Sequence, residues 1–117
     1  MCELMFPKPE KKRKVKHHPR PILPTRPGIC YLCAREEGNY KEQYTELHHV
    51  VFGGGGRVRS EENGLKVYLC LRHHRTGKDA VHNCRETRER LCAYMQEAYE
   101  QDHTREEWMR IAYKNYL

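Results

Sequence analysis

Two pairs of metal-binding side chains stand far apart in the sequence. Cys30 and Cys33 enclose two residues, and Cys70 and His73 enclose two more. Thiolates and imidazoles are the ligands of tetrahedral structural zinc sites, and in a small domain the free energy of zinc binding contributes directly to folding. The spacing therefore predicts that these four residues hold a structural Zn²⁺. The alternative is that Cys33 and Cys70 are ordinary buried thiols.

Four further histidines in the same part of the chain are not needed for that zinc site: His48, His49, His74 and His82. A neutral imidazole is a good ligand for divalent cations, and it can accept a proton near neutral pH. Successive side chains of a strand point to opposite faces, so His48 and His49 can have different roles. A hairpin followed by a helix can bring these histidines together, which predicts a second, open cation site.

Short hydrophobic runs predict the elements that would position these side chains. Cys30 to Cys33 would form a tight knuckle. Residues 47–52 and 65–69 read as strands, joined by a glycine-rich loop over 53–64. The segment 70–84 is expected to be a helix that is interrupted near Gly77.

The last third of the chain has a helical pattern. Apolar residues recur at spacings of three and four between Arg85 and Asp102, and Thr104 with Glu107 makes a capping-box pattern for a second helix. Cys84 and Cys92 are expected to be packing residues there. The fold class predicted is a small α+β domain, a zinc-stapled core over 28–84 with a C-terminal helical pair over 85–117 packed on it.

The excess positive charge lies at the N-terminus. The chain has a net charge of +6, all of it in residues 1–27, a proline-rich stretch that also contains Cys2 and reads as a disordered basic arm. Cations on a flexible arm suit DNA phosphates, and the candidates are Lys11, Lys12, Arg13, Lys14 and Lys16. The alternative is a solvated leader. The run KKRKV also looks like a nuclear import signal, but five residues are too few to set localisation.

Neither a secretory leader nor a membrane-spanning stretch is recognisable in the sequence. We therefore expect a cytoplasmic protein with no membrane partner. In a reducing compartment the cysteine pairs are better read as metal ligands than as disulfides.

The order of these motifs resembles the HNH endonucleases, the ββα-metal group, in the version braced by a treble-clef zinc site. The resemblance covers residues 30–82 and rests on CYLC, ELHHVVFGG, GLKVYLC, CLRHH and AVH. It implies that His48 holds a catalytic cation, with His74 and His82 completing the site. It also implies that His49 is the general base that activates water, and that Asn63 steadies the loop or orients that base.

The resemblance implies a DNA-cleaving hydrolase with two kinds of cation. Zn²⁺ would be structural, while the catalytic site could use Mg²⁺ or Mn²⁺, or Zn²⁺ or Ni²⁺. The glycines at 53–56 would let the backbone approach DNA, with Arg57 and Arg59 on its phosphates; the alternative is a flexible loop. One departure is that His74 and His82 are eight residues apart with Gly77 between them. Either the segment RTGKDAV loops out and returns His82 to the site, or His82 only caps a helix.

A narrower similarity exists to the phage recombination enhancement (Ref-like) nucleases. It rests on HHVVFGG, GLKVYLC, HHRTG and AVHN together with the basic leader and the two closing helices. It implies a phage-encoded nuclease that acts in the bacterial cytoplasm, in recombination, on a single strand or displacement loop presented by a RecA filament. Two other hypotheses remain: a non-catalytic zinc-finger module that binds DNA, and a protein-interaction adaptor that uses the aromatic C-terminal helices.

Overall fold

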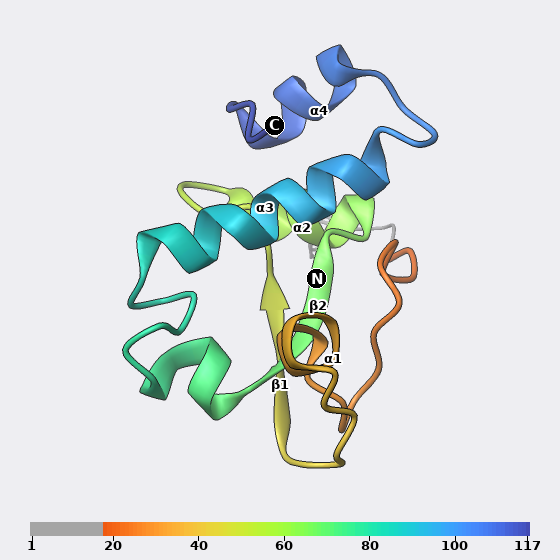
Figure 1. Ribbon diagram of the computed structural model, residues 1–117. Coiled ribbons are helices and arrows are strands. Elements are labelled where there is room, and N and C mark those ends of the chain that lie inside the picture. Colours follow the sequence, from red (N-terminus) through yellow and green to blue (C-terminus); the bar gives the residue numbers. More distant parts are fainter. Residues whose placement is uncertain (1–17) are drawn as a thin grey trace, which may run out of the picture.

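The computed structural model describes residues 18–117, which form a small α+β domain (Figure 1). At its centre is an antiparallel hairpin of two strands, with Thr45 opposite Cys70 and His49 opposite Lys66. The elements in chain order are α1 (Tyr31–Glu37), β1 (Thr45–His49), α2 (Gly56–Asn63), β2 (Lys66–Cys70), the π-helical turn η2 (Arg72–Thr76), α3 (Arg85–Tyr99) and α4 (Arg105–Ala112). The α+β class and the hairpin are confirmed.

The glycine-rich connection is not all loop, contrary to the prediction for 53–64. Its second half is helix α2, which starts after Gly55 at φ 74° and ends at Gly64 at φ 71°. Gly56 has to be a glycine because a Cβ there would lie 2.5 Å from the Val51 carbonyl oxygen. The glycines therefore provide the sharp turn and close approach with which the chain enters this helix.

The segment 70–84 also differs from the predicted helix. Only η2 is helical, and the chain then runs through a loop to Cys84, the N-cap residue of α3. A Cβ on Gly77 would lie 2.5 Å from the Arg72 carbonyl oxygen. The loop folds back on η2, where Val81 N–H donates to the His73 carbonyl at 2.7 Å and His82 N–H donates to the His74 carbonyl at 3.2 Å.

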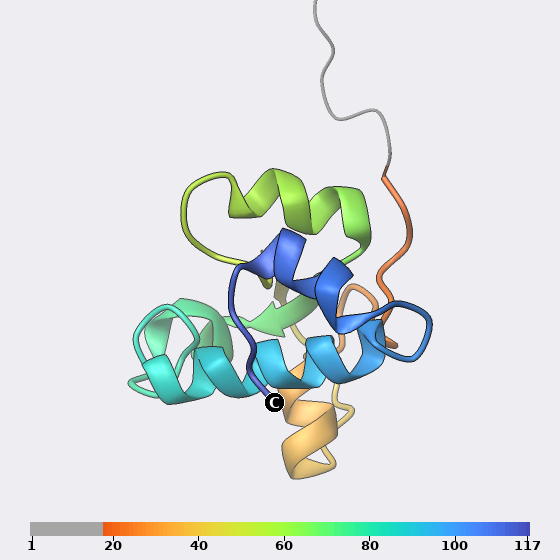
Figure 2. The same ribbon diagram turned by 90° about the horizontal axis from the view of Figure 1, so that it is seen from above.

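The two C-terminal helices are confirmed. Thr104 and Glu107 form the predicted capping box at the start of α4. Leu91 and Met95 of α3 and Trp108 of α4 are fully buried in the same core as Leu32, Val67 and Leu69 from the rest of the domain. Helix α4 lies over α2 and α3, on the side away from the hairpin (Figure 1, Figure 2), and Arg59 of α2 donates from Nε to the Ile111 carbonyl of α4 at 2.7 Å. The helical pair is thus packed on the core.

The described part of the predicted arm, residues 18–27, packs against the domain. Leu23 is buried in the core, Ile22 N–H donates to the Gly64 carbonyl, and the Thr25 hydroxyl accepts from Tyr68 N–H. Lys11, Lys12, Arg13, Lys14, Lys16 and Cys2 lie outside the described residues. Among the residues described, no helix has both the length and the apolar character needed to cross a bilayer.

Candidate functional site

The first candidate site is a cluster of Cys30, Cys33, Cys70 and His73, the Cys/His cluster. Cys30 caps helix α1 and Cys33 lies in its first turn, whereas Cys70 ends β2 and His73 lies on η2. All four are buried, and no residue of the cluster is more than 6% exposed. One ligand pair thus comes from the start of α1, and the other comes from the end of β2 and the turn η2 that follows it.

The distances within the Cys/His cluster fit one tetrahedral ion. Nδ1 of His73 lies 3.3 Å, 3.4 Å and 3.5 Å from the sulfurs of Cys30, Cys33 and Cys70, and the Cys33 and Cys70 sulfurs are 3.8 Å apart. Ligands held about 2.1 to 2.3 Å from a tetrahedral zinc ion are separated by roughly 3.5 to 3.8 Å. The cluster could therefore hold a metal ion such as zinc.

The electrostatics of the thiols also favour a cation. Burial, together with Cys30 and Cys70, raises the pKa of the Cys33 thiol to about 12, and burial raises the pKa of Cys30. Three thiolates cannot share this space unless positive charge compensates them. Gln43 Nε2 and Arg72 Nη2, each 3.7 Å from the Cys33 sulfur, supply weak donors around it.

The second candidate site is formed by His48, His74 and His82, the histidine triad. One nitrogen from each ring lies within 4.8 Å of the others, so the triad could hold a metal ion. Nε2 of His74 and Nε2 of His82 are 3.0 Å apart, about the separation of two nitrogens at right angles on a cation 2.1 Å from each. The backbone bonds that return the 77–82 loop to η2 bring His82 to this position.

Burial favours the neutral form of two histidines of the triad, and a neutral imidazole can bind a cation. Burial lowers the pKa of His48 to about 3, with contributions from His74 and His82, and burial also lowers the pKa of His82. Nδ1 of His74 lies 2.8 Å from Oε1 of Glu46. A neutral His74 that donates Nδ1–H to this carboxylate presents the lone pair of Nε2 to the other two rings.

Glu46 was not predicted from the sequence, although its position offered a signal. It stands two residues before His48, on the same face of β1. Arg75 binds both of its oxygens at 2.8 Å, and Tyr44 donates to Oε2 at 2.9 Å. These bonds, first those from Arg75 and then that from His74, hold the pKa of Glu46 far below its usual range, so it is a permanent anion beside the triad.

The residues that surround the triad include two arginines. A pocket of about 370 Å³ opens over it and contains His48, His49, His74, His82, Phe52, Arg57 and Arg88 among its lining residues. Arg88 comes from α3, far along the sequence, and its guanidinium lies over the Phe52 ring at 4.9 Å. No sequence pattern connects Arg88 with the histidines, so only the fold reveals it.

Two polar atoms in this pocket are buried without a partner. Within the described residues, the only buried side-chain nitrogens or oxygens lacking a hydrogen-bond partner are Nε2 of His48 and Nε of Arg88. A buried polar atom without a partner destabilises the fold by about 1–3 kcal/mol. Nε2 of His48 can offer a lone pair to a cation. Nε of Arg88 can donate its N–H to an anion.

Other predicted site residues are engaged differently. The Asn63 amide does not hydrogen-bond to His49 but donates within α2 to the Arg59 carbonyl at 2.8 Å. The partner of His49 is instead Glu61, at 2.7 Å. Arg59, expected on phosphates, donates to the carbonyls of Ile111 and Gly54 and lies over the Tyr113 ring. Glu61, rather than Asn63, is thus the hydrogen-bond partner of His49, and Arg59 braces α2 against α4.

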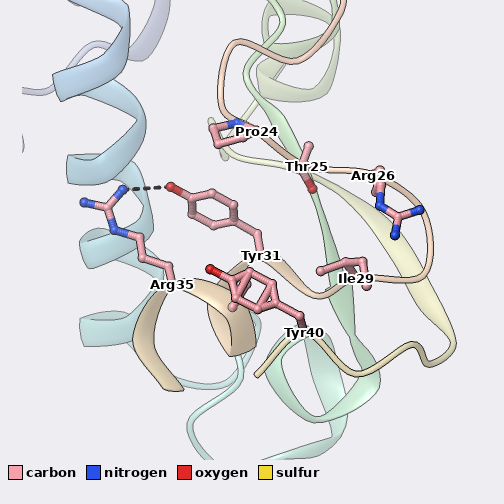
Figure 3. A pocket seen from close by; sticks show the side chains of 8 residues that line it. Pro24, Thr25, Arg26, Ile29, Tyr31, Arg35 and Tyr40 are labelled. Atoms are coloured by element: carbon pink, nitrogen blue, oxygen red, sulfur yellow. Dashed lines mark hydrogen bonds between the residues drawn. The ribbon is translucent and has the colours of Figure 1, made fainter. Parts of the chain in front are cut away.

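A second cavity, of about 700 Å³, has no residue of either cluster in its lining (Figure 3). It is lined by Pro24, Thr25, Arg26, Ile29, Tyr31, Ala34, Arg35 and Tyr40. Arg35 donates to the Tyr31 hydroxyl at 2.7 Å on one wall. The lining has neither cysteine nor histidine, so the smaller histidine pocket is the better candidate for metal chemistry.

The comparisons with known proteins add no family assignment. The chain matches no protein-family model, no curated protein and no solved structure. Its function therefore has to be argued from its own residues.

Proposed function

We propose that the protein is a metal-dependent DNA endonuclease or nickase of the HNH type, which hydrolyses phosphodiester bonds at the histidine triad. The observation that carries this proposal is the pair of buried, unpartnered atoms, Nε2 of His48 and Nε of Arg88, in one pocket. A cation bound by His48 together with a phosphate bound by Arg88 would satisfy both. A phosphodiester, whose oxygens can bind both a cation and a guanidinium, meets those two requirements.

Cation binding, proton abstraction and phosphate binding fall to different residues in this proposal. His48, His74 and His82 would hold the catalytic cation, which when bound stabilises negative charge on the phosphate and on the leaving oxygen. His49, in the same pocket, takes a proton from the attacking water as general base. Arg88 and Arg57 bind phosphate oxygens, with Arg88 held in place by its bond from Nη1 to the Val81 carbonyl at 3.0 Å.

The finer proposals rest on the sequence resemblance. In this proposal the enzyme is phage-encoded and acts in the cytoplasm of a bacterial host during recombination. Its substrate would be a single strand or displacement loop, presented by a RecA filament. The cationic residues of 1–17 would hold the DNA backbone without reading its sequence.

The test is nicking of supercoiled and of single-stranded circular DNA with Mg²⁺ or Mn²⁺, each with and without RecA and ATP. The proposal expects wild-type protein to produce nicked or linear product that EDTA prevents. Cleavage only with RecA would support the Ref-like hypothesis. DNA binding without product under every condition would instead support a non-catalytic zinc-finger module.

Glu46 provides a prediction that is specific to the triad. Replacement of Glu46 by glutamine removes the anion that orients His74, and the affinity of the triad for a cation is expected to fall by roughly 10- to 100-fold. Titration of the zinc-loaded protein with Mn²⁺ or Co²⁺ measures this change, and Glu62→Gln on the exposed side of α2 is the matched control. An unchanged affinity in Glu46→Gln would mean that Glu46 only pairs with Arg75.

A further inference from the structure

The His49 side chain is bound to a carboxylate that has three partners. Nε2 of His49 lies 2.7 Å from Oε1 of Glu61. The other oxygen, Oε2, accepts from Lys66 Nζ at 2.6 Å and lies 3.0 Å from His18 Nδ1. Oε1 of Glu61 therefore has one partner and Oε2 has two, and these three contacts hold the plane of the carboxylate in place.

Both sides of this contact are shielded from water. The side chains of His49, Glu61 and Lys66 are 14%, 19% and 10% exposed. The bond from Lys66 and then those from His49 and His18 lower the pKa of Glu61 to about 2, so the group is ionised at any pH at which the protein would act. Lys66 balances the charge of Glu61.

The fold produces this arrangement from three elements. Residues His49 and Lys66 are cross-strand neighbours at the end of the hairpin. Helix α2 precedes β2 and ends at its C-cap Gly64, where the chain turns into β2. Glu61, near the end of α2, therefore lies close to His49 and Lys66. Val51 N–H donates to the Ser60 hydroxyl at 2.9 Å, which ties the helix to the end of β1 next to Glu61.

We propose, building on the endonuclease function above, that Glu61 is the positioning residue of the general base. A neutral His49 that donates Nε2–H to Glu61 keeps its lone pair on Nδ1, so the ring has one tautomer and one orientation. That nitrogen is the atom that accepts the proton of the attacking water. Lys66 holds Glu61 in the rotamer that this requires and acts only through it.

The substitution Glu61→Gln distinguishes control of the His49 tautomer by Glu61 from a role of Glu61 in packing alone. A side-chain amide has one acceptor atom and one donor group, and Lys66 can only donate, so the amide oxygen turns toward Lys66. The NH₂ group then faces Nε2 of His49 and donates to it, which shifts the ring proton to Nδ1. The variant keeps the size of the side chain but leaves His49 in the tautomer that cannot accept a proton from water.

The test combines kinetics with the tautomer of His49 in the zinc-loaded full-length protein. Glu61→Gln is expected to lower kcat for DNA nicking by roughly 100-fold or more with KM little changed, since a base in the wrong tautomer loses its proton-accepting atom. The exposed neighbour Glu62→Gln should match wild type. Equal kcat values for wild type and Glu61→Gln would overturn the positioning role while leaving the endonuclease function in place.

A second measurement does not depend on cleavage. Long-range ¹H–¹⁵N spectra of the histidine rings report which nitrogen carries the proton. Neutral His49 should be the Nε2–H tautomer in wild type and the Nδ1–H tautomer in Glu61→Gln. The Nδ1–H tautomer in wild type, or no change on substitution, would overturn the inference even if the protein cuts no DNA.

Discussion

A His49→Ala variant is expected to keep its fold and its metal content but to nick DNA more slowly by at least roughly 100-fold, the usual contribution of a general base. His49 lies beside the histidine triad without belonging to the set of side chains that could hold the ion. Removal of its ring therefore eliminates the proton acceptor and leaves the cation site. Rates at saturating metal and DNA, together with circular dichroism spectra, measure the two effects separately.

The control for His49→Ala is the same substitution at His103. That ring stacks on Tyr99 with a centroid distance of 4.1 Å, in the connection between α3 and α4 rather than in the pocket. His103→Ala should cut DNA like wild type. Comparable nicking by wild type and His49→Ala would remove His49 from the mechanism and with it the proposed assignment of the base.

Replacement of Cys33 by serine is expected to unfold the domain. Cys33 is 2% exposed and lies at the centre of the Cys/His cluster, in contact with both Cys70 and His73. A serine hydroxyl is a poor zinc ligand, so the variant loses the ion and the folding free energy that comes with it. Thermal denaturation followed by circular dichroism, with zinc content measured on the same sample, tests this expectation.

Cys84→Ser is the matched control for that experiment. Cys84 is a free thiol outside the Cys/His cluster, at the N-cap of α3, where serine is a favourable residue. The Cys84→Ser variant should retain its zinc and its thermal stability. A Cys33→Ser protein that melts like wild type would show that the four residues are ordinary core side chains, the alternative weighed for these thiols.

The two clusters are coupled by their positions in the chain. His73 belongs to the Cys/His cluster and His74, the next residue, belongs to the histidine triad; both lie on η2 directly after β2. A metal ion that joins η2 to α1 would fix the direction of His74 as well. Loss of the structural ion is thus expected to disperse the triad, whereas loss of the triad leaves the Cys/His cluster intact.

Local patterns were sufficient to predict the parts of the structure that depend on nearby residues. The spacing of Cys30 with Cys33 and of Cys70 with His73 identified a cluster that the fold does assemble. Capping of α4 by Thr104 and the apolar repeat of α3 depend on neighbours within a turn or two of helix, so both were predicted. The second strand, predicted over 65–69, was nearly right, whereas the first, predicted over 47–52, shares only residues 47–49 with β1, because Val50 and Val51 lie beyond its end.

The errors came where backbone contacts, or side-chain contacts between different elements, decide the structure. The glycine run suggested a loop, but Gly56 is there to let α2 approach Val51, and this approach cannot be read from the run itself. The 70–84 segment folds back because Val81 and His82 bond to η2. Glu61 on α2 hydrogen-bonds His49, and Arg88 on α3 lines the pocket over the triad, so neither could be paired with a histidine before the fold was known.

The most direct test of the account is a count of the metal ions that the folded protein binds. Native mass spectrometry of the zinc-loaded chain, before and after addition of Mn²⁺ or Co²⁺, reports this number for wild type and for His48→Ala. The account predicts one tightly held zinc in both proteins and a second cation in wild type alone. One cation in wild type under all loading conditions, or a second cation that His48→Ala binds equally well, would contradict the claim that the histidine triad is a catalytic metal site.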